Sequence, residues 1–172
     1  MLLREFNISM KYPILIIEGC DASGKSTLAQ QIMEKYPNHV YMHNAVTDDI
    51  YSLHKNTITS AIEASKEHIV VIDRLHLSEK IYGTLYRGGP SYDVDAFDKY
   101  LNTISNVKKI LCIVDKETCL AKHDGRKEKE MFDDVSKVWD MYNSVNDKTW
   151  IKYNWKTDII DLNDFTVTPQ MR

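Results

Sequence analysis

One stretch constrains the fold of this chain more than any other: residues 13–27, which read PILIIEGCDASGKST. It begins with a short apolar run rich in β-branched side chains, which is typical of a buried parallel strand. The pattern Gly-x-x-x-x-Gly-Lys-Ser follows at residues 19–26, and helical periodicity continues after it. A strand, this pattern and a helix in that order predict a loop whose backbone N–H groups surround a polyphosphate at a helix N-terminus.

The residue types in this loop suit phosphate chemistry. Its glycines allow the backbone to curl so that successive N–H groups point inward. Lys25 would reach the β- and γ-phosphates of a nucleotide, and the hydroxyl of Ser26 would be a ligand of Mg²⁺. We therefore predict a phosphate site made of Gly19, Asp21, Ala22, Ser23, Gly24, Lys25, Ser26 and Thr27.

The length and composition of the chain are those of a globular protein. Its 172 residues predict one domain over residues 1–172, and 43% of them are apolar. The net charge of −3 gives no electrostatic support to a nucleic-acid partner, and no apolar run is long enough to cross a membrane. The three cysteines are odd in number and lack Cys-x-x-Cys spacing, so we expect reduced thiols and a cytoplasmic location.

Short apolar runs alternate with helical periodicity along the chain. We expect strands at residues 13–18, 39–43, 69–72 and 109–114, and a last one near 159–160. We expect helices at residues 24–36, 48–66 and 95–105, a helix from about 77 that is interrupted at Gly83 and at 87–90, and a helical region at 117–143 that is broken at 124–126. This alternation predicts an α/β fold of three layers, a five-stranded parallel sheet flanked by helices, with ligands at the carboxyl ends of its strands.

Other motifs narrow the phosphate chemistry. The chain has no Asn-Lys-x-Asp motif for reading a base, which disfavours a GTPase, and it is short for a large ATPase. Three further stretches carry information: VIDRLHLSEKIY at 71–82, DGRKEKEMF at 124–132 with Tyr142 beyond it, and Tyr51-x-x-x-Lys55. Together with the phosphate loop, they resemble the thymidylate kinases, a family of P-loop nucleoside monophosphate kinases, and indicate a divergent, phage-type member.

The resemblance implies a role for each key residue of the Asp-Arg stretch. Asp73 would hold Mg²⁺ together with Ser26, and Arg74 would bind the phosphate of the acceptor. Tyr82 would crowd the sugar 2′ position and so exclude ribonucleotides, while Ser78 would face the base. The alternative is a surface ion pair between Asp73 and Arg74, with Tyr82 as a core residue.

Two further parts of the acceptor site follow from the resemblance. Asp21 would lie close to the sugar 3′-hydroxyl, although a carboxylate that caps the loop is an alternative. Tyr51 would stack on thymine, and Lys55 stands where the family commonly has an arginine that holds the base or phosphate. Because lysine cannot make a planar two-pronged contact, the base preference stays open, and a helix face without any ligand is the alternative.

The stretch at 124–132 is similar to the mobile lid of the family, which we expect near residues 122–130. Arg126, Glu128, Phe132 and Tyr142 fall at matching offsets. Phosphoryl transfer depends on positioning and charge neutralisation, so an arginine that closes over the γ-phosphate suits the chemistry. The resemblance thus implies that Arg126 neutralises the negative charge of the transition state. The alternative is that Arg126 is a solvated charge at the start of a helix.

These residues predict an enzyme that transfers the γ-phosphoryl group of ATP to a deoxynucleoside 5′-monophosphate, above all dTMP and secondly dUMP, with Mg²⁺ as cofactor. The predicted catalytic residues are Lys25, Arg74 and Arg126. One alternative is a deoxynucleoside kinase, whose carboxylate base would be Glu18, and another is a nucleotide-binding module without turnover. The expected partners are small-molecule nucleotides and, by the resemblance, a second copy in a homodimer.

Overall fold

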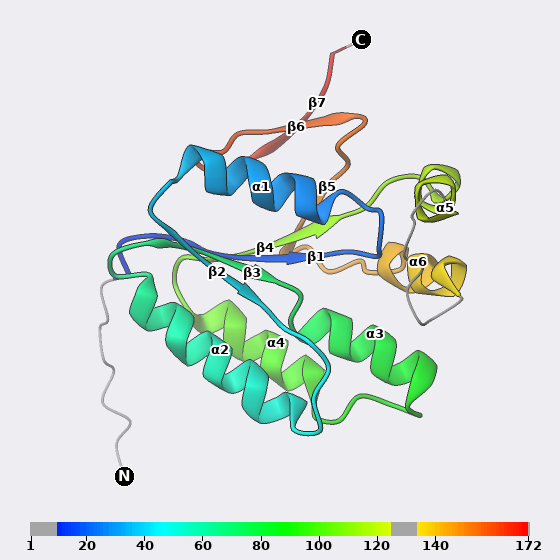
Figure 1. Ribbon diagram of the computed structural model, residues 1–172, viewed down its shortest axis with the longest axis horizontal. Helices are drawn as coiled ribbons and strands as arrows, with labels where there is room; N and C mark the ends of the chain where they lie inside the picture. Colours follow the sequence, from blue (N-terminus) through cyan, green and yellow to red (C-terminus); the bar gives the residue numbers. More distant parts are fainter. Residues whose placement is uncertain (1–9, 125–133, 172) are drawn as a thin grey trace.

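A computed structural model of the protein describes residues 10–124 and 134–171 (Figure 1). The strands are β1 (Ile14–Glu18), β2 (His39–His43), β3 (Ile69–Asp73), β4 (Val107–Cys112), β5 (Trp150–Tyr153), β6 (Asp158–Ile160) and β7 (Val167–Pro169). The helices are α1 (Lys25–Lys35), α2 (Ile50–Ala64), α3 (His76–Tyr86), α4 (Val94–Thr103), α5 (Lys116–Asp124) and α6 (Val135–Asn143). None of the helices in the described part of the chain is long and apolar enough to cross a membrane.

Five strands form one parallel sheet in the order β2-β3-β1-β4-β5. The central strands β1 and β3 are apolar runs that are buried on both faces, as parallel strands between two layers must be. Ile17 pairs with Asp73, and Glu18 pairs with Leu111, so the carboxyl ends of the three middle strands lie at one edge. The predicted α/β fold with a five-stranded parallel sheet is therefore confirmed.

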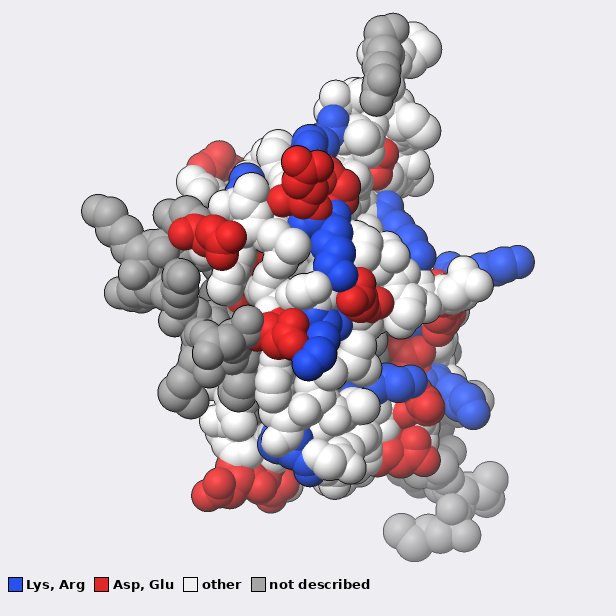
Figure 2. Space-filling view, turned by 90° about the vertical axis from the view of Figure 1, so that its right-hand side faces the viewer, with Lys and Arg blue, Asp and Glu red and all other residues white. Residues whose placement is uncertain are grey.

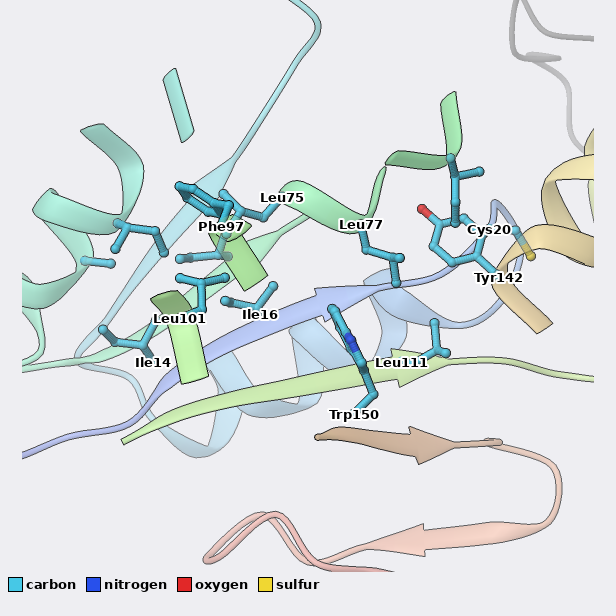
Figure 3. Close-up of a cluster of buried hydrophobic side chains, with 14 of the residues drawn as sticks. Ile14, Ile16, Cys20, Leu75, Leu77, Phe97, Leu101, Leu111, Tyr142 and Trp150 are labelled. Carbon is cyan, nitrogen blue, oxygen red and sulfur yellow. The ribbon is translucent and has the colours of Figure 1, made fainter. Parts of the chain in front are cut away.

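The two faces of the sheet pack against different layers (Figure 1). Ile14 and Ile16 of β1 lie in a core with residues of α2, α3, α4 and α6, part of which Figure 3 shows. Leu15 and Ile17 point to the opposite face, where α1 and the segment around Phe165 cover them. The alternation of side chains along a strand thus divides one apolar run between two cores.

The fifth strand of the sheet differs from the prediction. It is β5, which pairs in parallel with β4, whereas residues 159–160 belong to β6 and form an antiparallel pair with β7. Trp150 and Tyr153 are buried at the ends of β5, but Ile159 is 56% exposed. The prediction was wrong because the most apolar dipeptide of this region lies in the hairpin, while β5 is an edge strand with mixed burial.

Gly83 does not interrupt α3, contrary to the prediction. The helix continues to Tyr86, and a Cβ added at Gly83 would lie 2.8 Å from Cα of Pro90. The glycine therefore provides room for the turn at residues 87–90 to fold back onto the helix. The carbonyl of Gly83 accepts hydrogen bonds from the N–H groups of Arg87 and Gly89, each at 3.0 Å, which fixes this turn.

Candidate active site

The loop between β1 and α1 lies at the carboxyl edge of the sheet and packs tightly. Gly19 has φ 148° and Gly24 has φ 98°, values that favour glycine. A Cβ at Gly19 would lie 2.3 Å from the carbonyl oxygen of Cys112, and one at Gly24 would lie 2.7 Å from Cδ1 of Trp155. Both glycines of the motif are therefore required by the backbone and its neighbours.

This loop borders a cavity of about 480 Å³, which we call the loop cavity. Its lining includes most of the predicted phosphate site: Asp21, Ala22, Gly24, Lys25, Ser26 and Thr27. Lys25 is buried, its Nζ donates to the carbonyl oxygen of Cys20 at 3.0 Å, and burial lowers its pKa. Gly19 and Ser23 do not line the cavity; the Ser23 side chain is buried behind the loop.

Asp73 lies at the end of β3 and borders the same cavity as Ser26. Its Oδ2 accepts a hydrogen bond from the Tyr41 hydroxyl at 2.8 Å and lies 3.4 Å from Nδ1 of His43. Its Oδ1 is buried and has no hydrogen-bond partner among the described residues. A buried carboxylate oxygen that lacks a donor, beside a loop hydroxyl, fits the oxygen ligands that Mg²⁺ prefers.

Arg74 follows β3 with φ 68°, a left-handed conformation that is uncommon for arginine. Its guanidinium forms an ion pair with Asp21 at 2.5 Å and lies 3.5 Å from the Ser78 hydroxyl and 3.4 Å from that of Tyr82. The structure thus brings together four of the predicted acceptor-site residues. Arg74 pairs with the loop, not with Asp73, and Asp21 and Arg74 side chains are only 6% and 15% exposed.

Glu18 fixes the position of the first turn of α3 beside Arg74. It is fully buried, and its Oε1 accepts hydrogen bonds from the backbone N–H groups of Leu75 at 2.8 Å and Ser78 at 3.1 Å. Its Oε2 accepts from the Ser78 hydroxyl at 2.5 Å and lies 3.4 Å from the hydroxyl of Tyr142. Glu18 therefore caps the N-terminus of α3, where a negative charge is favourable, and fixes the helix that carries Ser78 and Tyr82.

A second cavity, of about 360 Å³, opens along α3, and we call it the α3 pocket. Arg74, Ser78 and Tyr82, which the sequence analysis assigned to the acceptor site, all line it. The sequence analysis missed several of its other lining residues, among them Ile50, His54, Glu79 and Arg87. A signal existed for His54: it lies four residues after Ile50, on the buried stripe of α2 that continues to Ile58 and Ala61.

Tyr51 and Lys55 do not line either of these cavities. They border a separate hollow with Tyr92 and Phe97, and the ring of Tyr51 lies 5.2 Å from that of Tyr92. Tyr51 is 47% exposed. The structure therefore does not bring this predicted pair together with Arg74.

The predicted lid lies largely outside the described residues, and this holds for Arg126, Glu128 and Phe132. Before it, α5 ends at Asp124, and Nζ of Lys122 lies 4.0 Å from the ring centroid of Trp155. Trp155 packs against the phosphate loop at Gly24, and Lys122, which lies over the Trp155 ring, lines the loop cavity. Lys122 lies at the start of the predicted lid, whereas Trp155 was not predicted, because no local motif marks it.

Charge at the site is concentrated in the loop cavity. Three cations, Lys25, Arg74 and Lys122, and two carboxylates, Asp21 and Asp73, line it. Figure 2 shows the end of the molecule where α5 and α6 lie, and the basic and acidic side chains on this face are interspersed. The cavity can thus attract an anionic ligand although the whole chain carries a net charge of −3.

Comparisons with protein-family models and with curated proteins gave no match. Among solved structures, the YorR protein of Bacillus subtilis, in complex with phosphorylated GDP, superposes with a TM-score of 0.62 at 18% identity, over 83% of this chain and 84% of that one. Deoxyadenosine kinase from M. mycoides with bound dATP gives a TM-score of 0.54 at 14% identity, over 86% and 93%. Thymidylate kinase from Candida albicans gives 0.53 at 14% identity, over 84% of each chain. The chain therefore has the α/β fold of the P-loop kinases.

Proposed function

We propose that the protein transfers the γ-phosphoryl group of ATP to a deoxynucleoside 5′-monophosphate, with dTMP as the first candidate and dUMP as the second. One observation carries the proposal: Arg74 lines both the loop cavity and the α3 pocket. A phosphate loop on one side of this arginine and the α3 pocket on the other suit a donor and an acceptor whose phosphates meet at Arg74.

Each group would act by positioning and by charge. Lys25 and the loop N–H groups would hold the β- and γ-phosphates of ATP, and Arg74 would hold the acceptor phosphate. Mg²⁺ bound by Ser26 and Asp73 would neutralise charge on the donor phosphates. An oxygen of the acceptor phosphate would attack the γ-phosphorus as the bond to the β-phosphate oxygen breaks, and Arg126, outside the described residues, would face the growing charge.

The acceptor oxygen is already anionic near neutral pH, so this reaction needs no general base. A deoxynucleoside kinase does need one, and Glu18 is the candidate that the sequence offers. Glu18 is fully buried, and donors occupy both of its carboxylate oxygens. This burial favours the monophosphate kinase over the nucleoside kinase. The resemblance to thymidylate kinases, together with the nucleotide and nucleoside kinases among the superposed structures, supports nucleotides as the substrates.

The test is ADP release by the purified protein with ATP and Mg²⁺, against dTMP, dUMP, dCMP, dGMP, dAMP, UMP and thymidine in parallel. We expect strong turnover of dTMP and little of UMP. The variant Arg74→Gln should lower kcat/KM by about 10²- to 10³-fold, because it removes a charged donor from the reacting phosphate. Lys80→Gln is the matched control: Lys80 lies on α3, the helix that follows Arg74, is half-exposed and pairs with Asp95.

Turnover of thymidine alone would favour the nucleoside kinase instead. If ATP bound but no acceptor were phosphorylated, the protein would be a nucleotide-binding module, and the proposal would be wrong.

A further inference from the structure

The α3 pocket extends beyond the residues that the sequence assigns to phosphate and sugar. Arg74 lies at one end, and Ser78 and Tyr82 line the wall that α3 provides. Arg87, at the far end of α3, lines the same pocket. If a monophosphate places its phosphate at Arg74, its base points towards Arg87.

On the opposite wall, α2 presents Ile50 and His54 to this pocket. The two have the same four-residue spacing as Tyr51 and Lys55 but lie one position earlier, which rotates the contact face by about 100°. Ile50 and His54 are 5% and 4% exposed, whereas Tyr51 is 47% exposed. The residues of α2 that meet a ligand in the pocket are therefore an aliphatic side chain and an imidazole, not an aromatic ring and a lysine.

The imidazole of His54 is uncharged at neutral pH, because burial lowers its pKa to about 4. Its Nδ1 lies 2.7 Å from the hydroxyl of Tyr92. A hydroxyl can donate to a ring nitrogen or accept from one, so His54 can present either a donor or an acceptor at Nε2. This wall adapts to the base and does not by itself select one.

Arg87, in contrast to His54, can only donate hydrogen bonds, and its side chain is held in one place. Arg87 directly follows the last residue of α3, and its Nη2 donates to Oε2 of Glu79, eight residues earlier in that helix, so the side chain runs back along α3. The Glu79 side chain is 2% exposed, and its Oε1 accepts from the backbone N–H of Ser91 at 2.8 Å. Both oxygens of Glu79 are thus occupied, and Glu79 holds the guanidinium of Arg87 in place. The other two nitrogens of Arg87 have no hydrogen-bond partner among the described residues.

We infer that Arg87 reads the base of the bound monophosphate and selects bases with a keto oxygen, at C4 of a pyrimidine or C6 of a purine, over those with an amino group there. Arginine carries only donors and keeps its charge. A keto oxygen accepts from it, whereas the amino group of cytosine or adenine would leave two donors facing each other. The inference rests on the proposed function and names the substrate class of the same site.

The experiment compares nucleotides whose bases differ in this group and in the proton on the adjacent ring nitrogen: dUMP with dCMP, and deoxyinosine monophosphate with dAMP. For each, kcat/KM is measured by ADP release and Kd by titration calorimetry without ATP. We expect the keto member of each pair to be preferred by about 10- to 100-fold, which is the discrimination that a good arginine contact to a base gives. Arg87→Gln should reduce this ratio to near one, because its amide can serve either group.

Arg87→Lys is the second variant, since it keeps a cation opposite the buried carboxylate of Glu79. We expect it to fold and to lose most of the preference, because lysine lacks the planar fork. Lys80→Gln, on the solvent side of α3, is the control that should keep the ratio. Melting temperatures of all variants separate a loss of selectivity from a loss of structure.

Variants at Arg87 that only lower the melting temperature and keep the ratio would overturn the inference. It would also fail if Lys55→Gln abolished the ratio, because base reading would then move to the other face of α2. Equal kcat/KM values for the two members of each pair would also overturn the inference, while leaving the proposed function intact. If the keto members bound selectively but were not phosphorylated, the inference would hold and the proposed function would fail.

Discussion

Strand periodicity explains why a charged residue, Glu18, is fully buried. Ile14 and Ile16 face the core beneath α2 and α3, and Glu18 continues the same alternation at the end of β1. The first turn of α3 meets it there with backbone and hydroxyl donors. A buried carboxylate is tolerated only when such donors compensate for lost water, so Glu18 and the N-terminus of α3 depend on each other.

We predict that Glu18→Gln lowers the free energy of unfolding by about 1–3 kcal/mol, because the new amide nitrogen cannot accept a hydrogen bond from Ser78 and leaves donors unsatisfied. Urea denaturation measures this change. Glu63→Gln is the control, since the Glu63 side chain is 73% exposed and its pair with Lys66 contributes little. A large loss of activity at unchanged stability would contradict this view and would make Glu18 a base.

The residues of the candidate site were predictable to the extent that local spacing defines them. The Gly-Lys-Ser pattern and the offsets of four and eight residues from Arg74 to Ser78 and Tyr82 are local in the sequence, and the structure brings Arg74, Ser78 and Tyr82 together. Glu79 and Arg87 gave no such signal, because their pairing depends on the turn that folds back after α3.

At the scale of elements, the hairpin of β6 and β7 lies beside α1 and helps α1 to cover one face of the sheet (Figure 1). Phe165, in the turn between the two strands, is 2% exposed and packs into the core with Leu28 and Tyr153. The hydroxyl of Tyr36, at the end of α1, donates to the carbonyl of Leu162 at 2.5 Å. Phe165 thus anchors this segment in the core on this face of the sheet, and the hydrogen bond of Tyr36 attaches it to the end of α1.

We predict that Phe165→Ala lowers the free energy of unfolding by about 3–5 kcal/mol, because it removes a fully buried aromatic ring and leaves a cavity. Ile159→Ala in the same hairpin should change it by less than about 0.5 kcal/mol, since Ile159 is 56% exposed. Urea titrations followed by fluorescence compare the two. Equal effects would show that the hairpin packs differently from the arrangement described here.

The elements were predictable where packing is uniform along them. β1 and β3 are buried on both faces, so each is an unbroken apolar run that stands out in the sequence. β5 lies at the edge of the sheet, and only its Trp150 and Tyr153 are buried, so neither an apolar run nor a strict alternation marks it. The strand conformation of β5 therefore depends on its pairing with β4, which no local pattern in the sequence reveals.

At the scale of the whole molecule, the three cysteines come from separate elements: Cys20 and Cys119 meet in the core on one face of the sheet, and Cys112 lies in the core on the other face. Cys20 lies in the phosphate loop, Cys112 at the end of β4 and Cys119 in α5, and each is 0% exposed. The Sγ atoms of Cys20 and Cys119 lie 3.1 Å apart, and Sγ of Cys119 donates to the carbonyl of Asp21 at 3.2 Å. The loop and α5 are therefore joined through buried sulfur, and access to it requires that these elements separate.

Thiol labelling tests whether they separate in the native protein. Burial raises the pKa of Cys112 to about 12, and the hydrogen bond with Cys119, together with burial, raises that of Cys20. Because the thiolate is the reactive form, a raised pKa suppresses reaction through pH 7–9. We predict that a disulfide reagent at pH 8 leaves all three native thiols unlabelled and that labelling in urea follows the global unfolding curve. Ser60→Cys, at an exposed position of α2, should react at once and serves as the control. Rapid stoichiometric labelling of a native thiol would contradict the prediction, and the identity of the labelled cysteine would show which element opens independently of the sheet.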